Sequence, residues 1–244
     1  MKVVSLVPSI TETLFDLGLT SDEIIGRTKF CIHPKNEVKN VEIIGGTKNL
    51  NIEKIKSLKP DLIIANKEEN VKEQVEELMQ DFKVLVTNVE TLEDNYYLLK
   101  QLGTIFGKEE KAQLFNQKIY EIFHFIKTKK PLKIAYLIWK NPYMTVGGDT
   151  FISKILEELG FENMFKNRKR YPEVQPEDLE GADWIFLSSE PFPFKEKHIE
   201  ELRTVCKKPK ITIVDGEAFS WYGTHLAKCG KYYEEFLREI ILRN

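Results

Sequence analysis

Short apolar runs alternate with helical patterns along this chain, and the alternation occurs twice. The first half contains the runs "VVSLV", "DLIIA" and "KVLVT", and the second half contains "KIAYLIW", "DWIFLS" and "KITIV". Continuous apolar runs rich in β-branched residues are typical of strands that are buried on both faces of a parallel sheet. Helices between such strands return the chain to the same edge of the sheet. The sequence therefore predicts an α/β fold with parallel sheets.

The two halves also match each other in the order of their motifs. "LFDLGL" has its counterpart in "LEELGF", and "PDLIIA" has its counterpart in "ADWIFLS". Between the halves lies a segment without Gly or Pro, and its apolar residues recur on one helical face: Ala112, Phe115, Ile119, Ile122, Phe123 and Ile126. We expect two similar α/β lobes joined by one long α-helix, with a ligand cleft between the lobes. The predicted boundaries are 1–106 for the N-terminal lobe, 107–130 for the linking backbone helix and 131–244 for the C-terminal lobe.

The composition excludes several classes of protein. A formal charge of −2 and a pI near 6.2, with both signs interspersed, leave no basic footprint for nucleic acid. No apolar stretch approaches the roughly 18 residues of a membrane span, and the first run is too short for the core of a signal peptide. We therefore expect no membrane insertion and, if the start is native, a cytoplasmic chain. The three cysteines are odd in number and widely spaced, so we expect free buried thiols.

The join at Pro8 and Ser9 is the first candidate site. The apolar run ends at Pro8, and Ser9 with Glu12 fits a capping box at the start of a helix. In open parallel sheets, ligands bind outside the carboxyl ends of the strands, where helices begin. The join therefore offers backbone N–H groups to an anionic or carbonyl-bearing ligand, although a capped helix without any further role explains Ser9 as well.

Large aromatic side chains are concentrated in the loops that follow the predicted strands. Surface loops usually carry polar turn residues, so rings there either pack into the core or line a binding site. Core packing explains any single ring, whereas the set as a whole favours a broad, flat, partly apolar ligand. The candidate rings are Phe30, Trp139, Tyr143, Tyr171, Phe192, Phe194, Phe219, Trp221 and Tyr222.

A second join, "NPYMTVGGDTF", combines two glycines with a helix start. Gly147 and Gly148 permit close backbone approach, and Asp149 or Thr150 can cap the following helix. The spacing matches no phosphate-binding loop or dinucleotide fingerprint. No nucleophile elbow or zinc motif is present either, so we expect no enzyme and no metal site. His33 and His225 lie in or near the cleft loops and are able to ligate a metal, but solvated or packed positions fit them equally well.

Four stretches together carry a family resemblance: "VVSLVPSITETLFDLG", "NLNIEKIKSLKPDLIIA", "NPYMTVGGDTFISKILEELGFENMF" and "YPEVQPEDLEGADWIFLSS". They resemble the helical-backbone substrate-binding proteins of ABC importers, most closely the vitamin B12 (cobalamin) receptors. The resemblance implies a corrinoid or other metal-chelating macrocycle as ligand, with no covalent cofactor. It places Pro8, Ser9, Tyr171 and Phe219 at the ligand. The cobalamin receptors have a Trp where this chain has Asn66, so one stacking platform is absent, and Trp139 or Trp221 is able to replace it.

The resemblance also implies a partner, an ABC permease dimer that receives each lobe through an acidic side chain. The matching positions fall on Lys72, beside Glu73, and near Glu177, although acids at helix starts are also explained by the helix dipole. The family implies a monomer that works in the periplasm or outside the cytoplasm. Two alternatives stay open. One is a siderophore, haem or metal-chelate receptor, favoured by Asn66 and the basic 168–170; the other is a cytosolic sensor or enzyme that retains the fold.

Overall fold

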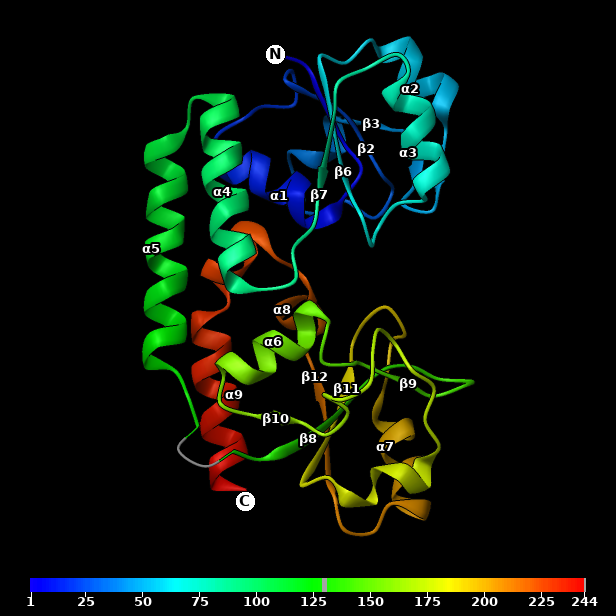
Figure 1. Ribbon diagram of the computed structural model, residues 1–244. Helices are drawn as coiled ribbons and strands as arrows, with labels where there is room; N and C mark the ends of the chain where they lie inside the picture. The colour runs from blue at the N-terminus through cyan, green and yellow to red at the C-terminus, as the bar shows by residue number, and fades with distance from the viewer. Residues whose placement is uncertain (129–130, 244) are drawn as a thin grey trace. The chain divides into compact units, whose positions relative to one another are not determined.

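A computed structural model describes residues 1–128 and 131–243 and divides the chain into two compact units. The first unit contains 1–89, 93–119 and 222–228, and the second contains 90–92, 120–221 and 229–244. Each unit is built around its own parallel sheet, as the apolar runs predict, so the predicted α/β fold is confirmed (Figure 1). No helix among the described residues is long and apolar enough to cross a membrane.

The first unit has a five-stranded parallel sheet in the order β3-β2-β1-β6-β7. Its central strand is fully buried, which explains its continuous apolar sequence. A two-stranded hairpin, β4-β5, lies outside the sheet. The elements in chain order are β1 (Val3–Ser5), α1 (Pro8–Asp16), β2 (Ile24–Arg27), η1 (Val38–Asn40), β3 (Glu42–Ile43), β4 (Gly45–Gly46), β5 (Asn49–Leu50), α2 (Ile52–Leu58), β6 (Leu62–Asn66), α3 (Lys72–Met79), β7 (Val84–Thr87) and α4 (Leu92–Phe106).

The second unit repeats the architecture with the parallel order β10-β8-β11-β12, and β9 pairs antiparallel with β8. Strands β8 and β11 bury their middle residues on both faces, and α6 and α9 carry apolar faces that pack in the same unit. The elements are β8 (Lys133–Trp139), β9 (Met144–Thr145), α6 (Phe151–Glu158), β10 (Glu162–Asn163), η2 (Pro176–Gly181), β11 (Trp184–Ser188), α7 (Glu196–Val205), β12 (Lys210–Val214), α8 (Gly216–Ser220) and α9 (Gly230–Leu242).

The boundaries between the units differ from the predicted ones. The predicted linking helix, 107–130, corresponds to α5 (Glu109–Phe125), and residues 129–130 lie outside the described part of the chain, as does Asn244. The boundary between the units falls after Ile119, inside α5. Residues 222–228, which we assigned to the C-terminal lobe, group with the first unit and contain η3 (Gly223–Lys228).

The capping box predicted at Ser9 is wrong. Helix α1 begins at Pro8, so Val7 is the N-cap and contributes no side-chain cap. Proline favours the first helical position because its φ is preset and its missing N–H needs no partner there. Ser9 therefore lies inside the first turn, and Glu12 is directed to other partners. At α6 the prediction is confirmed, since the Thr150 side chain accepts a hydrogen bond from the Ser153 N–H. The free, buried cysteines are confirmed as well.

Candidate functional site

The order of strands indicates a candidate ligand-binding edge in each unit. In the first unit the chain passes from β1 to β2 on one side and later to β6 on the other side of β1. In the second unit β8 is likewise flanked by β10 and β11. Ligands of open parallel sheets bind at such switch points, outside the carboxyl ends of the strands. The candidate residues are therefore those in the loops after β1, β2 and β6, and after β8, β11 and β12.

Pro8 and Ser9 lie directly after β1, as predicted, but they differ in exposure. Pro8 is partly exposed, whereas Ser9 is 4% exposed. The Ser9 carbonyl oxygen accepts a hydrogen bond of 2.8 Å from the Thr13 hydroxyl. The start of α1 thus presents mainly the Pro8 ring and backbone groups at this edge.

Phe30 is the exposed ring of the first unit's edge. Its side chain is 50% exposed, and the Lys29 ammonium lies 5.1 Å from the ring centroid. The loop that carries it is held from below by the buried guanidinium of Arg27, which donates to the carbonyl oxygens of Val38 at 2.8 Å and Cys31 at 3.1 Å. Fixing the loop in this way reduces the entropy lost when a ligand covers the ring.

Asn66 is a structural residue at the end of β6. It is 3% exposed, and its amide nitrogen donates to the Thr87 carbonyl oxygen at 3.2 Å. Its side-chain oxygen accepts from the N–H of Glu68 at 2.8 Å, while its own N–H donates to the Asn70 side chain at 2.9 Å. These bonds fix the turn that leaves the strand.

Tyr222 belongs to the first unit, although its neighbour Trp221 belongs to the second. The Tyr222 ring is 6% exposed and lies beside Ser9 and Thr87. Burial raises the pKa of its phenol well above the ordinary value. Tyr222 therefore joins the residues after β1 and β7, a grouping that its position in the sequence does not reveal.

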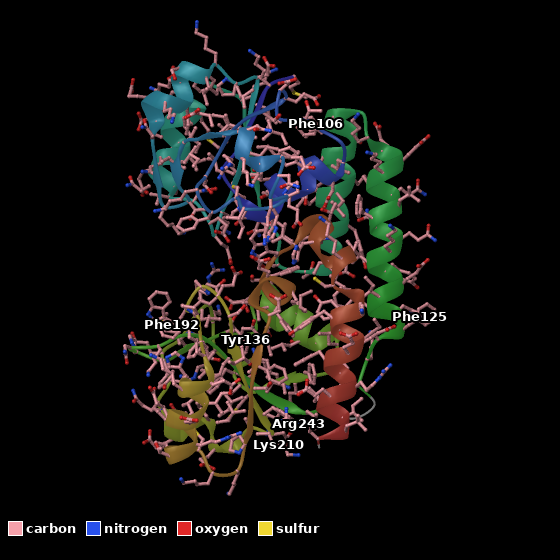
Figure 2. The ribbon with its side chains drawn as sticks, turned by 180° about the vertical axis from the view of Figure 1, so that it is seen from behind. Phe106, Phe125, Tyr136, Phe192, Lys210 and Arg243 are labelled. Carbon is pink, nitrogen blue, oxygen red and sulfur yellow. The ribbon has the colours of Figure 1, made fainter. Side chains whose placement is uncertain are left out.

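Aromatic side chains form a partly exposed cluster at the carboxyl edge of the second unit. Trp139, the last residue of β8, is 41% exposed, and its ring centroid lies 5.8 Å from that of Phe192 in an edge-to-face arrangement. The ring centroid of Phe192 also lies 4.7 Å from that of Phe194 and 5.3 Å from that of His198. In Figure 2, Phe192 lies at the surface of this unit and Tyr136 lies inside it. The loop after β11 thus supports Trp139 from one side.

Tyr143 and Tyr171 lie at the ends of two segments that pair with each other through their backbones. The Val174 N–H donates to the Tyr143 carbonyl oxygen at 3.0 Å, and the Thr145 N–H donates to the Pro172 carbonyl oxygen at 3.0 Å. Tyr143 is partly buried against the core, and burial raises the pKa of its phenol. Tyr171 is partly exposed, with the Arg170 guanidinium 5.7 Å from its ring centroid. Tyr143 therefore directly precedes β9, and Tyr171 begins the segment that pairs with β9.

Phe219 and Trp221 are buried. Phe219 is 0% exposed, and its ring centroid lies 5.4 Å from that of Tyr136 and 5.9 Å from that of Phe236. It is therefore part of the second unit's core. Trp221 is 8% exposed, and its indole N–H donates to the Glu190 carboxylate at 3.0 Å. Burial raises the pKa of Glu190, whose carboxylate also accepts from the Ser220 hydroxyl at 2.8 Å.

A charge cluster around the buried Glu12 carboxylate in the first unit was not predicted from the sequence. Glu12, 4% exposed, accepts from Lys228 at 2.8 Å and lies 2.7 Å from His225 Nδ1. Lys228 also pairs with Asp16 at 2.6 Å. The spacing of four residues between Glu12 and Asp16 places both carboxylates on one face of α1, a signal present in the sequence.

The described residues do not bring His33 and His225 together with further metal ligands. The rings of His33 and His225 are 6.4 Å apart between centroids. Within residues 1–128 and 131–243, no three His, Cys, Asp or Glu side chains are arranged to hold a metal ion.

The two acids proposed for docking are exposed, Glu73 in the first turn of α3 and Glu177 in the first turn of η2.

The chain is similar to known binding proteins in sequence. A family model described as "Periplasmic binding protein" matches residues 3–204. A vitamin B12-binding protein of Pectobacterium atrosepticum is 29% identical over 189 residues, which cover 73% of this chain and 67% of that protein. The uncharacterized ABC transporter substrate-binding lipoprotein YvrC of Bacillus subtilis is 30% identical over 191 residues, covering 73% of this chain and 60% of that protein. The alignments thus span about two thirds of these relatives.

Solved structures share the fold over nearly the whole chain. The periplasmic vitamin B12 binding protein BtuF of Vibrio cholerae matches with a TM-score of 0.82 and 20% identity, covering 97% of this chain and 96% of that chain. The periplasmic heme binding protein HutB of Vibrio cholerae matches with a TM-score of 0.81 and 19% identity, covering 97% of this chain and 98% of that chain. At these identities the matches show the fold and leave the ligand open.

Proposed function

The chain belongs to the periplasmic binding protein family, and from this premise we propose that it is the non-enzymatic receptor of an ABC importer for cobalamin or a related corrinoid. The receptor is a monomer that works outside the cytoplasmic membrane and delivers its ligand to a permease dimer. Glu73 and Glu177 are the proposed docking residues for the two permease subunits.

The observation that carries the proposal is the aromatic cluster at the carboxyl edge of the second unit. An indole that is 41% exposed at the end of a buried strand, braced at 5.8 Å by Phe192, is a rigid apolar platform. Such rings supply large contact area at low entropic cost and suit a flat macrocycle. Trp139 takes the stacking role for which Asn66 is too small and too buried.

The other proposed contacts follow the same edges. In the second unit they are Tyr143, Tyr171 and Trp221, and in the first unit they are Pro8, Ser9, Phe30 and Tyr222. Phe30 is the most exposed of the first unit's candidates. Asn66 and Phe219 act indirectly, since both are at most 3% exposed and hold the surfaces on which the contacts lie. The known relatives named for vitamin B12 support the corrinoid over other flat ligands.

Calorimetric titration with cyanocobalamin, haemin and a ferric catecholate tests the proposal. We expect saturable binding of cyanocobalamin, tighter than that of the other two. Preference for haemin or for the ferric catecholate would favour the alternative receptor classes. Absence of saturable binding to all three would contradict a receptor for any of these chelates and return attention to a sensor or enzyme.

A further inference from the structure

A turn with four cationic side chains leads into Tyr171 in the second unit. Residues 166–170 have the sequence "KNRKR", and all five are exposed. We name residues 166–170 the basic turn. From its charge, its fixed backbone and its aromatic neighbour we infer that it recognises an anionic substituent, a phosphate or a carboxylate, at the edge of the ligand. The inference rests on the proposed function and specifies its ligand further.

The backbone of the basic turn is held in place by the two glycines. The N–H of Gly147 donates to the Arg170 carbonyl oxygen at 2.7 Å, and the N–H of Gly148 donates to the Arg168 carbonyl oxygen at 3.0 Å. A Cβ at Gly148 would lie 2.1 Å from the Lys166 carbonyl oxygen, so only glycine permits this approach. The Asp149 carboxylate accepts the Arg170 N–H at 2.6 Å. The turn is therefore ordered before any ligand arrives, which lowers the entropic cost of binding.

The cationic groups of the turn are only partly neutralised. Lys166 pairs with Glu162 at 3.0 Å, and Asp149 lies at the base of the turn. The Arg168 guanidinium lies over the Phe165 ring and donates to the Glu173 carbonyl oxygen, which is neutral. Within the described parts of the chain, neither Arg168 nor Lys169 forms an ion pair with a carboxylate. These two side chains are therefore the ones available to an external anion.

The turn carries its charge next to Tyr171, one of the proposed contact residues. The turn leads directly into Tyr171, and the Arg170 guanidinium lies over that ring. In the segment that follows, the Val174 N–H donates to the Tyr143 carbonyl oxygen. A ligand with a flat apolar body and an anionic side group would match this combination. A guanidinium and an ammonium bind phosphate and carboxylate oxygens through charge-assisted hydrogen bonds.

The test compares a charged ligand with its uncharged counterpart. Cyanocobalamin carries a phosphodiester that dicyanocobinamide lacks, and haemin carries two propionates that its dimethyl ester masks. The variant R168Q/K169Q removes two positive charges and keeps both glycine contacts. The matched control, K207Q/K208Q, removes two positive charges from exposed lysines that precede β12. The single variant K169Q serves if the double variant unfolds, because no contact of the described residues uses that ammonium.

We expect R168Q/K169Q to bind the charged ligand about ten-fold more weakly than wild type, with K169Q intermediate, and the uncharged counterpart with unchanged affinity. A loss confined to cyanocobalamin identifies a phosphodiester, and a loss confined to haemin identifies propionates. Unchanged binding, equal losses for charged and uncharged ligands, or an equal loss in the control would overturn the inference while the proposed receptor function stands. If wild-type protein bound none of the four compounds, the proposed function itself would fail, and the inference with it.

Discussion

His225 Nδ1 lies 2.7 Å from Oε2 of Glu12, a residue 213 positions earlier in the chain. With Lys228 on the other carboxylate oxygen, this contact attaches the segment 222–228 to α1 within the first unit. Gly223, with φ at +81°, permits the approach, because a Cβ there would lie 2.0 Å from the Thr13 hydroxyl oxygen. The contact therefore decides where Tyr222 lies.

We expect the contribution of Glu12 to stability to depend on pH. Burial raises the pKa of Glu12, but hydrogen bonds and charges from His225 and Lys228 outweigh burial, so the net pKa lies below the ordinary value of 4.5. A depressed folded-state pKa stabilises the fold above that ordinary value, and the contribution is lost as the pH falls through the folded-state pKa.

The variant Glu12→Ala should lower the free energy of unfolding by about 2 kcal/mol near neutral pH, because it removes the contacts of a buried carboxylate with His225 and Lys228. Thermal unfolding should show that the difference in stability between wild type and Glu12→Ala becomes smaller below about pH 4. The control Glu239→Ala removes an exposed pair with Arg243 and should cost less than about 0.5 kcal/mol. A difference between wild type and Glu12→Ala that does not change with pH would contradict the assignment.

Trp139→Ala should weaken corrinoid binding by about 2 kcal/mol, or about thirty-fold, because it removes the central ring of the proposed platform. Calorimetric titration measures the change. Phe125→Ala is the matched control, since that ring is 77% exposed on α5 and is no part of the candidate site. Equal affinities of the Trp139 variant and wild type would exclude this ring from the site.

Replacement of Asn66 should lower the stability of the fold more than it lowers the affinity for a corrinoid. Asn66→Ala removes bonds to Thr87 and to the N–H of Glu68, and should lower the free energy of unfolding by about 2 kcal/mol. Asn66→Trp should destabilise the fold and fail to raise corrinoid affinity, because the position is 3% exposed. Asn40→Ala, at an exposed residue, is the control for thermal unfolding. A Trp variant with wild-type stability and higher affinity would show that the position faces the ligand.

If Glu73 and Glu177 dock on the permease, their replacement should impair transport without changing ligand affinity. Glu73→Lys and Glu177→Lys should leave corrinoid affinity unchanged and reduce receptor-stimulated ATP hydrolysis by the cognate permease in proteoliposomes about ten-fold or more. Glu53→Lys reverses an exposed acid in the first turn of α2 and is the matched control. Full stimulation by both docking variants would remove these acids from the interface.

The sequence predicts those features that depend on local pattern. Buried parallel strands are continuous apolar runs, so β1, β6, β8 and β11 could be found from their sequences, and Thr150 could be predicted as a cap. The start of α1 was misjudged, because Pro8 occupies the first helical turn and displaces Ser9 from the cap position.

Features that depend on tertiary packing could not be read from the sequence. Trp139 ends one strand of the second unit's sheet and Phe219 follows another, yet Trp139 is 41% exposed and Phe219 is 0% exposed. The packing of Phe236 and Tyr136 around Phe219 decides the difference. The grouping of Tyr222 with the first unit depends on contacts with residues more than 200 positions away.

The central claim is that the chain binds a corrinoid without transforming it. Equilibrium dialysis of the wild-type protein against cyanocobalamin, with mass spectrometry of the ligand recovered from the protein side, tests both halves of that claim. The account predicts saturable retention of the corrinoid and recovery of unaltered cyanocobalamin. Equal concentrations on both sides of the membrane, or recovery of a chemically altered corrinoid, would contradict it.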